Sequence, residues 1–258
     1  GLEIIQENTH LSVIGIVEII KNFSFFKSVL KKTQEEITAW QPDLILMIDF
    51  PGFNLSLAKR IKKNSTQKLH ITYFISPQIW AWKEGRIKTI KKYIDMMLVI
   101  FPFEETYYKN KKINVHYIGH PFLDDLKSNL HVSSKEDLGI NKNKKLIGIF
   151  PGSRAEELKR HLPIYLKTIN KITKKYPEIE CALGLAPGFN ASEIEKKYNT
   201  KNIYIIDDSP LKMLSCCDVA LVTSGTISLE ASFMNIPSIV SYKLSNISWI
   251  ISLLLLKT

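Results

Sequence analysis

The feature that most constrains the fold is a regular alternation of short apolar runs with segments of helical periodicity. In the first half, helices are predicted near residues 23–37, 55–63, 85–92 and 104–109. Strands are predicted at residues 44–48, 69–75, 96–100 and 115–118. Strands that alternate with helices are typical of parallel sheets built from βαβ units.

A second series of the same kind begins after a polar stretch, which carries a capping-box pattern from Ser133 to Glu136. Its strands are predicted at residues 146–150, 179–185, 203–206, 219–222 and 238–242. Its first helix is predicted from an apolar stripe between residues 158 and 176. The chain is therefore predicted to be α/β, with two Rossmann-like domains facing a cleft. The predicted boundaries are 1–122 for the first domain, 123–145 for the linker and 146–258 for the second domain.

Two short loops of small residues follow apolar strands in the second half. Pro151–Arg154 follows the strand at 146–150, and Thr223–Thr226 follows the strand at 219–222. A strand, a tight turn and a helix together place free backbone N–H groups and the positive end of a helix dipole at one sheet edge. The two loops predict a site for a nucleotide diphosphate at that edge. The candidate residues are Gly152, Ser153, Arg154, Ser224, Gly225, Thr226 and Glu230.

Residue types suggest how such a site would work. Arg154 suits a diphosphate because its planar fork donates two hydrogen bonds at once, although a surface salt bridge is the alternative. Glu230 lies four residues after Thr226 on the same helix face, where it would meet ribose hydroxyls; the alternative is an ordinary exposed glutamate. The sequence has no D-x-D pair, so we expect no metal cofactor.

The first half offers candidates for the remaining chemistry. Asp49 ends a strand before a Pro-Gly turn and is a candidate catalytic base, with an Asx-turn or N-cap role as the alternative. Trp80 and Trp82 share one side of a segment predicted to be extended, and either stack on a ligand or pack in the core. His120 is a further candidate near the cleft, and it could equally cap the linker turn.

Charge and cysteine content narrow the class of protein. The net charge of +10 comes mainly from lysines, which indicates either a solvated basic surface or attraction to anionic lipid. No basic run is interleaved with aromatic residues, so nucleic acid is not an expected partner. Three cysteines without a C-x-x-C pair argue against a zinc site or a disulfide framework and favour a reducing cytosol. No signal peptide is visible.

Several motifs resemble one known family, the lipid-A-disaccharide synthases, which are GT-B glycosyltransferases of family 19. The resemblance covers essentially the whole chain. In the first half it rests on residues 48–54 (I-D-x-P-x-F-N), 75–82 (S-P-x-x-W-A-W) with Arg86, 101–104 (P-F-E) and 119–121 (G-H-P). In the second half it rests on 151–154 with Glu157 and on 224–226 with Glu230.

This resemblance implies a GT-B fold and an inverting transfer of diacylglucosamine from UDP to diacylglucosamine 1-phosphate. It also favours Asp49 as the base and adds Arg86 as a candidate on the acceptor side of the cleft. The implied partners are the UDP-linked acylated glucosamine, the acylated glucosamine 1-phosphate lipid and the inner-membrane surface of a Gram-negative bacterium, where the enzyme would be cytoplasmic and peripheral. A homodimer is one open alternative for its oligomeric state.

The chain also departs from the family pattern. The family's opening strand and its final segments are absent, so residues 1–258 resemble the middle of a longer protein with both domains incomplete. An apolar run at 249–256 is too short to span a bilayer and predicts a buried helix or an interfacial segment. Two other functions stay open: a UDP-sugar epimerase or hydrolase of the same fold, and a non-catalytic remnant that binds nucleotide or membrane.

Overall fold

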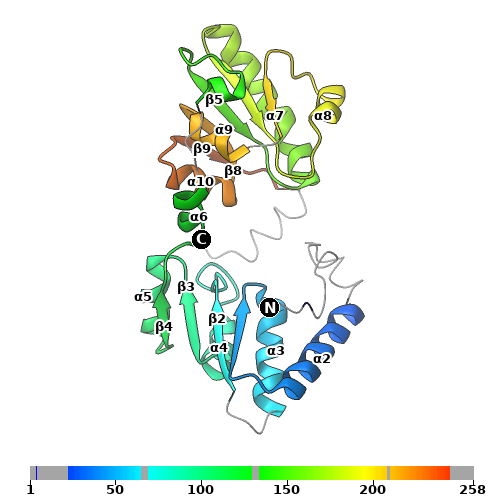
Figure 1. Cartoon of the computed structure of the whole chain (residues 1–258), viewed down its shortest axis with the longest axis vertical. Helices are drawn as coiled ribbons and strands as arrows, with labels where there is room; N and C mark the ends of the chain where they lie inside the picture. The colour runs from blue at the N-terminus through cyan, green and yellow to red at the C-terminus, as the bar shows by residue number, and fades with distance from the viewer. Residues whose placement is uncertain (1–3, 5–22, 65–68, 130–133, 208–209, 245–258) are drawn as a thin grey trace. The chain divides into compact units, whose positions relative to one another are not determined.

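The computed structural model describes residue 4 and residues 23–64, 69–129, 134–207 and 210–244 (Figure 1). The chain divides into two compact units, and the division falls between Pro121 and Phe122. The apolar run at 249–256 lies outside the described residues. Each unit is an α/β arrangement around its own parallel sheet, as the alternation of strands and helices predicts.

The first unit has a four-stranded parallel sheet in the order β1-β2-β3-β4. Its strands are β1 (Leu44–Ile48), β2 (His70–Phe74), β3 (Met96–Val99) and β4 (Val115–Tyr117). Its helices are α2 (Phe23–Trp40), α3 (Pro51–Asn64), the 3₁₀ turn η1 (Glu84–Arg86), α4 (Ile87–Tyr93) and α5 (Pro102–Asn110). The central strands β2 and β3 supply fully buried side chains such as Ile71, Tyr73 and Met97. In β1, which is an edge strand among the described residues, Met47 is buried but its neighbours Leu46 and Ile48 are exposed.

The second unit has a five-stranded parallel sheet in the order β7-β6-β5-β8-β9. Its strands are β5 (Leu146–Phe150), β6 (Glu180–Gly184), β7 (Tyr204–Ile206), β8 (Val219–Thr223) and β9 (Ser238–Ser241). Its helices are α6 (Pro121–Asn129), η2 (Glu136–Leu138), α7 (Ala155–Lys175), α8 (Ala191–Lys197), α9 (Pro210–Cys216) and α10 (Thr226–Phe233). The chain runs outward from β5 to β7 and then returns to β8 beside β5. Sheets of this class bind ligands where the strand order reverses in this way.

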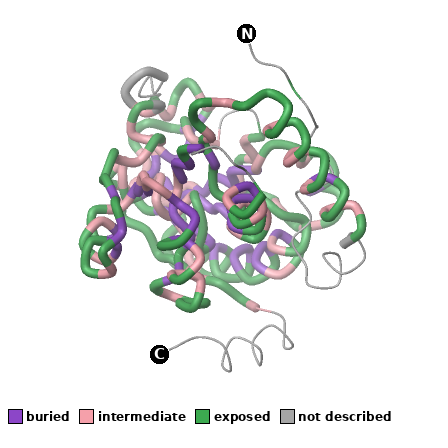
Figure 2. Tube along the Cα trace, turned by 90° about the horizontal axis from the view of Figure 1, so that it is seen from below, coloured by how far each residue is buried: buried purple, intermediate pink, exposed green. Residues whose placement is uncertain are grey.

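Both faces of the second sheet are covered by apolar side chains. Along β5, Leu146 and Phe150 belong to one core cluster, while Ile149 belongs to the other. This alternation follows from the two-residue period of a strand. Figure 2 colours the chain trace by burial, with buried residues in purple and exposed residues in green. The continuous apolar runs of the sequence are therefore explained by strands buried on both faces.

An aspartate holds two neighbouring strands together in each unit. In the first unit, Asp95 precedes β3 and accepts hydrogen bonds from Lys62 Nζ (2.7 Å) and from the backbone N–H of Ile71 in β2 (2.7 Å). In the second unit, Asp218 precedes β8 and accepts from Lys135 Nζ (2.7 Å), Lys145 Nζ (2.8 Å) and the N–H of Leu146 in β5 (2.9 Å). We call these two clusters the aspartate clamps.

The clamps shift the acidity of both aspartates. Partial burial alone would raise the pKa of each carboxyl group, but the hydrogen bonds from lysine and backbone N–H groups outweigh it. The pKa of Asp95 is lowered, and the pKa of Asp218 lies far below its usual range. Both groups therefore stay ionised and paired at neutral pH.

Two local predictions from the sequence need correction. The polar stretch 123–145 is not a plain linker, because it contains most of α6 and the turn η2, and Ile140 within it is buried in the core. Ser133 of the predicted capping box lies outside the described residues; Ser134 and Asp137 form a reciprocal pair, through a 2.8 Å and a 3.2 Å hydrogen bond. The segment with Trp80 and Trp82 is a turn rather than an extended strand, closed by bonds from Ala81 N and Trp82 N to Gln78 O.

Candidate functional site

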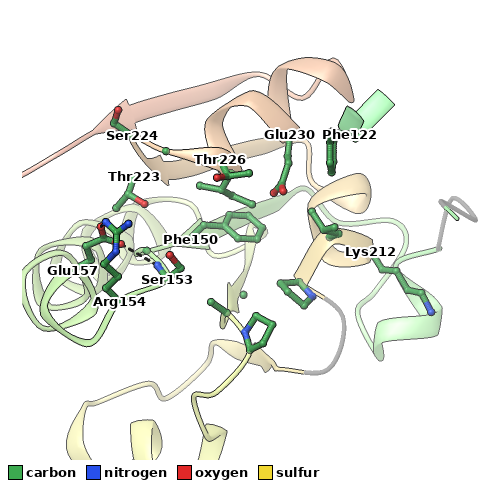
Figure 3. A pocket seen from close by; sticks show the side chains of 18 of the residues that line it. Phe122, Phe150, Ser153, Arg154, Glu157, Lys212, Thr223, Ser224, Thr226 and Glu230 are labelled. Atoms are coloured by element: carbon green, nitrogen blue, oxygen red, sulfur yellow. Dashed lines mark hydrogen bonds and ion pairs between the residues drawn. The ribbon is translucent and has the colours of Figure 1, made fainter. Parts of the chain in front are cut away.

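A pocket of about 780 Å³ opens at the carboxyl end of the second sheet, beside the point where the strand order reverses (Figure 3). The loops after β5 and β8 both line it. All seven residues predicted for the nucleotide site lie in its wall: Gly152, Ser153, Arg154, Ser224, Gly225, Thr226 and Glu230. Residues from α6, α9 and α10 complete the wall. The structure therefore brings together two loops that are about 70 residues apart in the chain, as the topology of a parallel sheet requires.

Glu157 organises the first loop. Its carboxylate accepts hydrogen bonds from the N–H of Ser153 (3.1 Å) and from the guanidinium of Arg154 (2.9 Å). Gly152 has φ +119°, and a Cβ at this position would lie 2.7 Å from Cβ of Glu157. Only glycine fits both this backbone conformation and this close approach. The residue type at position 152 is thus set by the glutamate packed against it.

The Arg154–Glu157 pair bears on the alternative of a simple surface salt bridge. The guanidinium is more than half exposed, whereas the Glu157 carboxylate is largely buried. Exposed ion pairs contribute little to stability, so the pair by itself does not explain why an arginine stands here. The exposed guanidinium lies in the wall of the pocket, where it can also donate to an anion.

Further contacts hold this loop against β9, and the sequence patterns did not predict them. The ring of His161, in α7, is buried between two backbone groups: Nδ1 lies 3.2 Å from Pro151 O, and Nε2 accepts from the N–H of Lys243 at 2.8 Å. Nε2 is therefore unprotonated, and Nδ1–H donates to Pro151 O. Tyr242 Oη donates to Glu157 at 3.3 Å. His161 thus joins the first loop to the segment after β9.

The second loop leads into α10. Thr226 is the first residue of this helix, and the Ser228 hydroxyl donates to Gly225 O at 2.6 Å. The first backbone N–H groups of a helix have no partner within it and carry partial positive charge. Thr226 is exposed in the pocket wall, so this end of α10 faces the pocket.

Glu230 projects from α10 into the same pocket, beside Phe122 (Figure 3). Desolvation by burial raises the pKa of this carboxyl group. Among the described residues, no hydrogen bond or ion pair to its side chain is present. It is thus a half-buried carboxylate without a compensating partner, not an ordinary exposed glutamate. Such an arrangement costs stability and is typical of ligand sites.

The floor of the pocket is apolar and tightly packed. The ring of Phe150 lies so close to Gly184 that an added Cβ would approach it to 2.5 Å. An added Cβ on Gly148 would approach the Sγ of Cys217 to 2.4 Å. Both glycines stand in strands where a side chain would displace the floor. They shape the pocket without touching its polar wall.

In the first unit, Asp49 stands directly after β1 with a positive φ of 45°. Its backbone carbonyl accepts from the hydroxyl of Tyr73 and from Asn54 Nδ2. Its exposed carboxylate makes no capping hydrogen bond among the described residues, so the structure gives no support to an Asx-turn or N-cap role. Asn54 holds the turn instead, through Ile48 O and Asp49 O. The carboxylate is left accessible at the carboxyl end of this sheet.

The other first-unit candidates follow strands β2 and β4 of the same sheet. Trp80 donates from Nε1 to Glu104 at 3.3 Å and is 42% exposed. Trp82 is also exposed and carries Lys83 Nζ 4.3 Å and Arg86 Cζ 5.9 Å from its ring centroid. His120 packs against Phe101 with a centroid distance of 5.7 Å. Neither tryptophan is a core residue, so the core-packing alternative is wrong for both.

Comparison with known proteins settles the family. The family model described as lipid-A-disaccharide synthetase matches residues 1–258. Lipid-A-disaccharide synthase 1 of Legionella pneumophila (strain Lens) is 35% identical over 261 residues, which cover 100% of this chain and 67% of the relative. The lipid-A-disaccharide synthase of Nitrosococcus oceani is 34% identical, covering 100% of this chain and 66% of the relative. The chain belongs to the lipid-A-disaccharide synthase family. It spans about two thirds of the length of these relatives.

Solved structures add information about the fold. The UDP-GlcNAc 2-epimerase from Neisseria meningitidis bound to UDP-GlcNAc matches with a TM-score of 0.56 at 15% identity, covering 94% of this chain and 70% of the epimerase. The spinosyn rhamnosyltransferase SpnG complexed with thymidine diphosphate matches with a TM-score of 0.53 at 12% identity. The match covers 86% of this chain and 59% of the rhamnosyltransferase. These likenesses confirm the predicted GT-B type of fold and, at such identities, carry no statement about activity.

Family membership decides between two of the functions predicted from the sequence. The synthases match at 34–35% identity along the whole chain, whereas the epimerase likeness is one of fold. The prediction of a glycosyltransferase of lipid A disaccharide synthesis is therefore confirmed at the level of the family. In the described part of the chain, no helix meets the length and apolarity needed to cross a membrane.

Proposed function

We propose that this protein transfers diacylglucosamine from a UDP donor to diacylglucosamine 1-phosphate, giving the lipid A disaccharide phosphate and UDP. The observation that carries the proposal is the pocket at the carboxyl end of the second sheet. The wall of that pocket contains the backbones of two loops and the exposed Arg154, which suit a diphosphate. The unpaired carboxylate of Glu230 lies in the same wall.

Each wall group has a distinct role in the proposed donor complex. Arg154 and the N–H groups at the start of α10 bind the diphosphate and stabilise the negative charge that develops as UDP leaves. The Glu230 carboxylate accepts hydrogen bonds from the ribose hydroxyls, which gives it the partners it lacks in the free protein. The fixed positive groups do the work that a metal ion performs in other transferases, so we propose a metal-independent reaction.

The reaction also needs a base for the acceptor hydroxyl. We propose Asp49, whose carboxylate is exposed and uncommitted at the end of β1. The hydroxyl oxygen attacks the anomeric carbon, the bond from that carbon to the UDP oxygen breaks, and Asp49 takes the hydroxyl proton. The attack on the face opposite the leaving group inverts the anomeric configuration.

The location proposed for the enzyme is the cytoplasmic surface of the inner membrane. The lipid nature of both proposed substrates calls for access to a membrane surface. The net charge of +10 supports this proposal, because anionic lipid attracts clustered lysine and arginine.

A two-substrate assay tests the proposal against the epimerase or hydrolase alternative. The purified protein is incubated with the UDP-linked diacylglucosamine, with and without diacylglucosamine 1-phosphate. We expect disaccharide and UDP to appear in equal amounts, and only when both lipids are present. Release of UDP at the same rate without acceptor would show a hydrolytic activity instead. Binding of UDP with no turnover under either condition would support the non-catalytic remnant.

A further inference from the structure

A buried carboxylate in the first unit has no part in the reaction described so far. Glu104, in the first turn of α5, is 1% exposed. Its Oε1 accepts from the Ser76 hydroxyl at 2.7 Å and from Trp80 Nε1 at 3.3 Å, and its Oε2 accepts from the N–H of Phe101 at 3.3 Å. No ion pair to Glu104 is present among the described residues.

The bond to Phe101 N alone would be the ordinary cap of a helix, which a surface glutamate can provide. The other oxygen reaches across to the turn after β2. A second α5 side chain reaches the same turn, because Tyr108 donates from its hydroxyl to Pro77 O at 3.1 Å. Helix α5 therefore holds this turn at Ser76, Pro77 and Trp80. Within the turn, the backbone N–H groups of Ile79, Ala81 and Trp82 make short-range hydrogen bonds.

The outer side of this turn is an exposed aromatic surface. Trp80 meets Phe103 edge-to-face with ring centroids 5.1 Å apart, and Phe103 stacks on Phe101 at 5.8 Å. Phe103 is 50% exposed. We call Trp80, Phe101 and Phe103 the aromatic ledge. It stands at the same sheet edge as Asp49, because its residues follow β2 and β3 while Asp49 follows β1.

A buried carboxylate without a cation is a costly way to hold a turn in place. An apolar side chain would fill the space with no desolvated charge. The carboxylate instead provides directional hydrogen bonds. It accepts from three donors at once and so fixes the orientation of the Trp80 ring. The arrangement favours specificity of position over stability.

We propose that Glu104 is a positioning residue that orients Trp80, so that the aromatic ledge binds the apolar surface of the acylated sugar acceptor. This inference rests on the proposed function for the identity of the acceptor. The placement of Trp80 by Glu104 is a statement about this chain alone, and it has its own measurement.

The experiment compares Glu104→Gln, Trp80→Phe and the double variant. A carboxamide offers one accepting oxygen, so its NH₂ group must face either Phe101 N–H or the donors of Ser76 and Trp80. Trp80→Phe removes the indole N–H and keeps an aromatic ring. We expect each single variant to raise the KM for the acceptor roughly 10-fold, the worth of one charge-assisted hydrogen bond. The kcat and the KM for the UDP donor should change less than twofold.

The double variant should show no further rise beyond the larger single effect, because both changes break the same bond. Glu105→Gln is the matched control, since Glu105 lies on the same helix but bonds to Lys109 and Tyr117 N instead; its acceptor KM should match the wild type. Independent, additive effects of Glu104→Gln and Trp80→Phe would overturn the proposal. So would equal losses of acceptor affinity, donor affinity and thermal stability in Glu104→Gln, which would mark a purely structural residue.

Tryptophan fluorescence separates this inference from the proposed function. The fluorescence emission of Trp80 is obtained as the difference between the emission spectra of proteins with and without the Trp80→Phe substitution. We expect Glu104→Gln to shift that emission to longer wavelength and to increase its quenching by acrylamide. If the protein forms no disaccharide, the proposed function fails, and the fluorescence result still decides the positioning: an unchanged Trp80 signal in Glu104→Gln overturns it.

Discussion

The two units are alike at the amino ends of their strands, where an aspartate clamp joins neighbouring strands. They differ at the carboxyl ends, where each carries a different set of side chains. At the amino ends of the strands, Asp95 and Asp218 each bind a lysine and the backbone of a neighbouring strand. At the carboxyl ends, the first unit carries Asp49 and an aromatic ledge, whereas the second carries two small-residue loops around a pocket. The carboxylates at the amino edges are paired. Asp49 and Glu230, at the carboxyl edges, have no partner among the described residues.

This contrast shows where the second unit gives up stability at its proposed ligand site. A paired aspartate such as Asp218 stabilises the fold, while a desolvated and unpaired Glu230 destabilises it. The topology explains why the pocket is in the second unit. Its strand order reverses between β5 and β8, whereas the described strands of the first sheet run from β1 to β4 in chain order.

The largest effect is expected at Asp49. Asp49→Asn keeps the shape of the side chain but cannot take a proton, so turnover should fall at least about 100-fold, the lower range for loss of a general base. UDP affinity should stay within twofold, because the pocket belongs to the other unit. Asp43→Asn is the control, since Asp43 is equally exposed but precedes β1. Turnover of Asp49→Asn within a few-fold of wild type would mean that another group is the base.

The clamps are expected to affect stability rather than catalysis. Asp218→Asn replaces a carboxylate that accepts two lysines and a backbone N–H, and should lower the free energy of unfolding by about 2–3 kcal/mol. Asp95→Asn should cost somewhat less, because one lysine binds there. Denaturant titrations of the two variants measure both values. Equal stability of Asp218→Asn and wild type would contradict the role given to this clamp.

The same clamps give a pH dependence of known sign. The folded pKa of Asp218 lies below its unfolded value of about 3.9, so its stabilisation is complete above that pH and is lost as the pH falls toward the folded pKa. The stability difference between wild type and Asp218→Asn should therefore be constant from neutral pH to about pH 5 and shrink below about pH 4. Unfolding curves recorded across this range test it. A difference that grows on acidification would show the opposite sign.

The smallest effect is expected at Glu230, where stability and binding should change in opposite directions. Glu230→Gln removes a desolvated charge without a partner, so the free protein should gain up to about 1 kcal/mol of stability at neutral pH. UDP affinity should fall about 10-fold, because a carboxamide accepts the ribose hydroxyls less strongly than a carboxylate. Thermal unfolding with and without UDP measures both. Loss of stability in the free variant would mean that the carboxylate is paired.

The strands and the two small-residue loops could be predicted from the sequence, because they depend on the local pattern of apolar and small residues. Leu44–Ile48 and Leu146–Phe150 are strands over the predicted residues, and both small-residue loops follow their strands. Exposure along β1 was not predictable, because it depends on β1 being an edge strand. The apolar run at 44–48 is the same whether or not a neighbour covers it.

The contacts that organise the sites are long-range, and no local pattern reports them. Glu104 reaches a serine 28 residues earlier, and His161 bonds to a backbone group 82 residues later. Neither contact was predicted, because the P-F-E motif marks Glu104 without showing its partner and His161 resembles any other histidine in a helical pattern. The segment at Trp80 was predicted as extended, whereas bonds from α5 and short-range bonds within the segment fold it into a turn.

The most direct test of the central claim, that the second unit binds the nucleotide, is calorimetric titration of UDP into wild type, Arg154→Ala and Arg160→Ala. Arg160 is a matched control, since it pairs with Glu156 on the same helix and does not line the pocket. We predict that Arg154→Ala weakens UDP binding by about 1.5–3 kcal/mol, the worth of a charged hydrogen bond, and that Arg160→Ala binds like wild type. Unchanged affinity in Arg154→Ala, or an equal loss in both variants, would contradict the account.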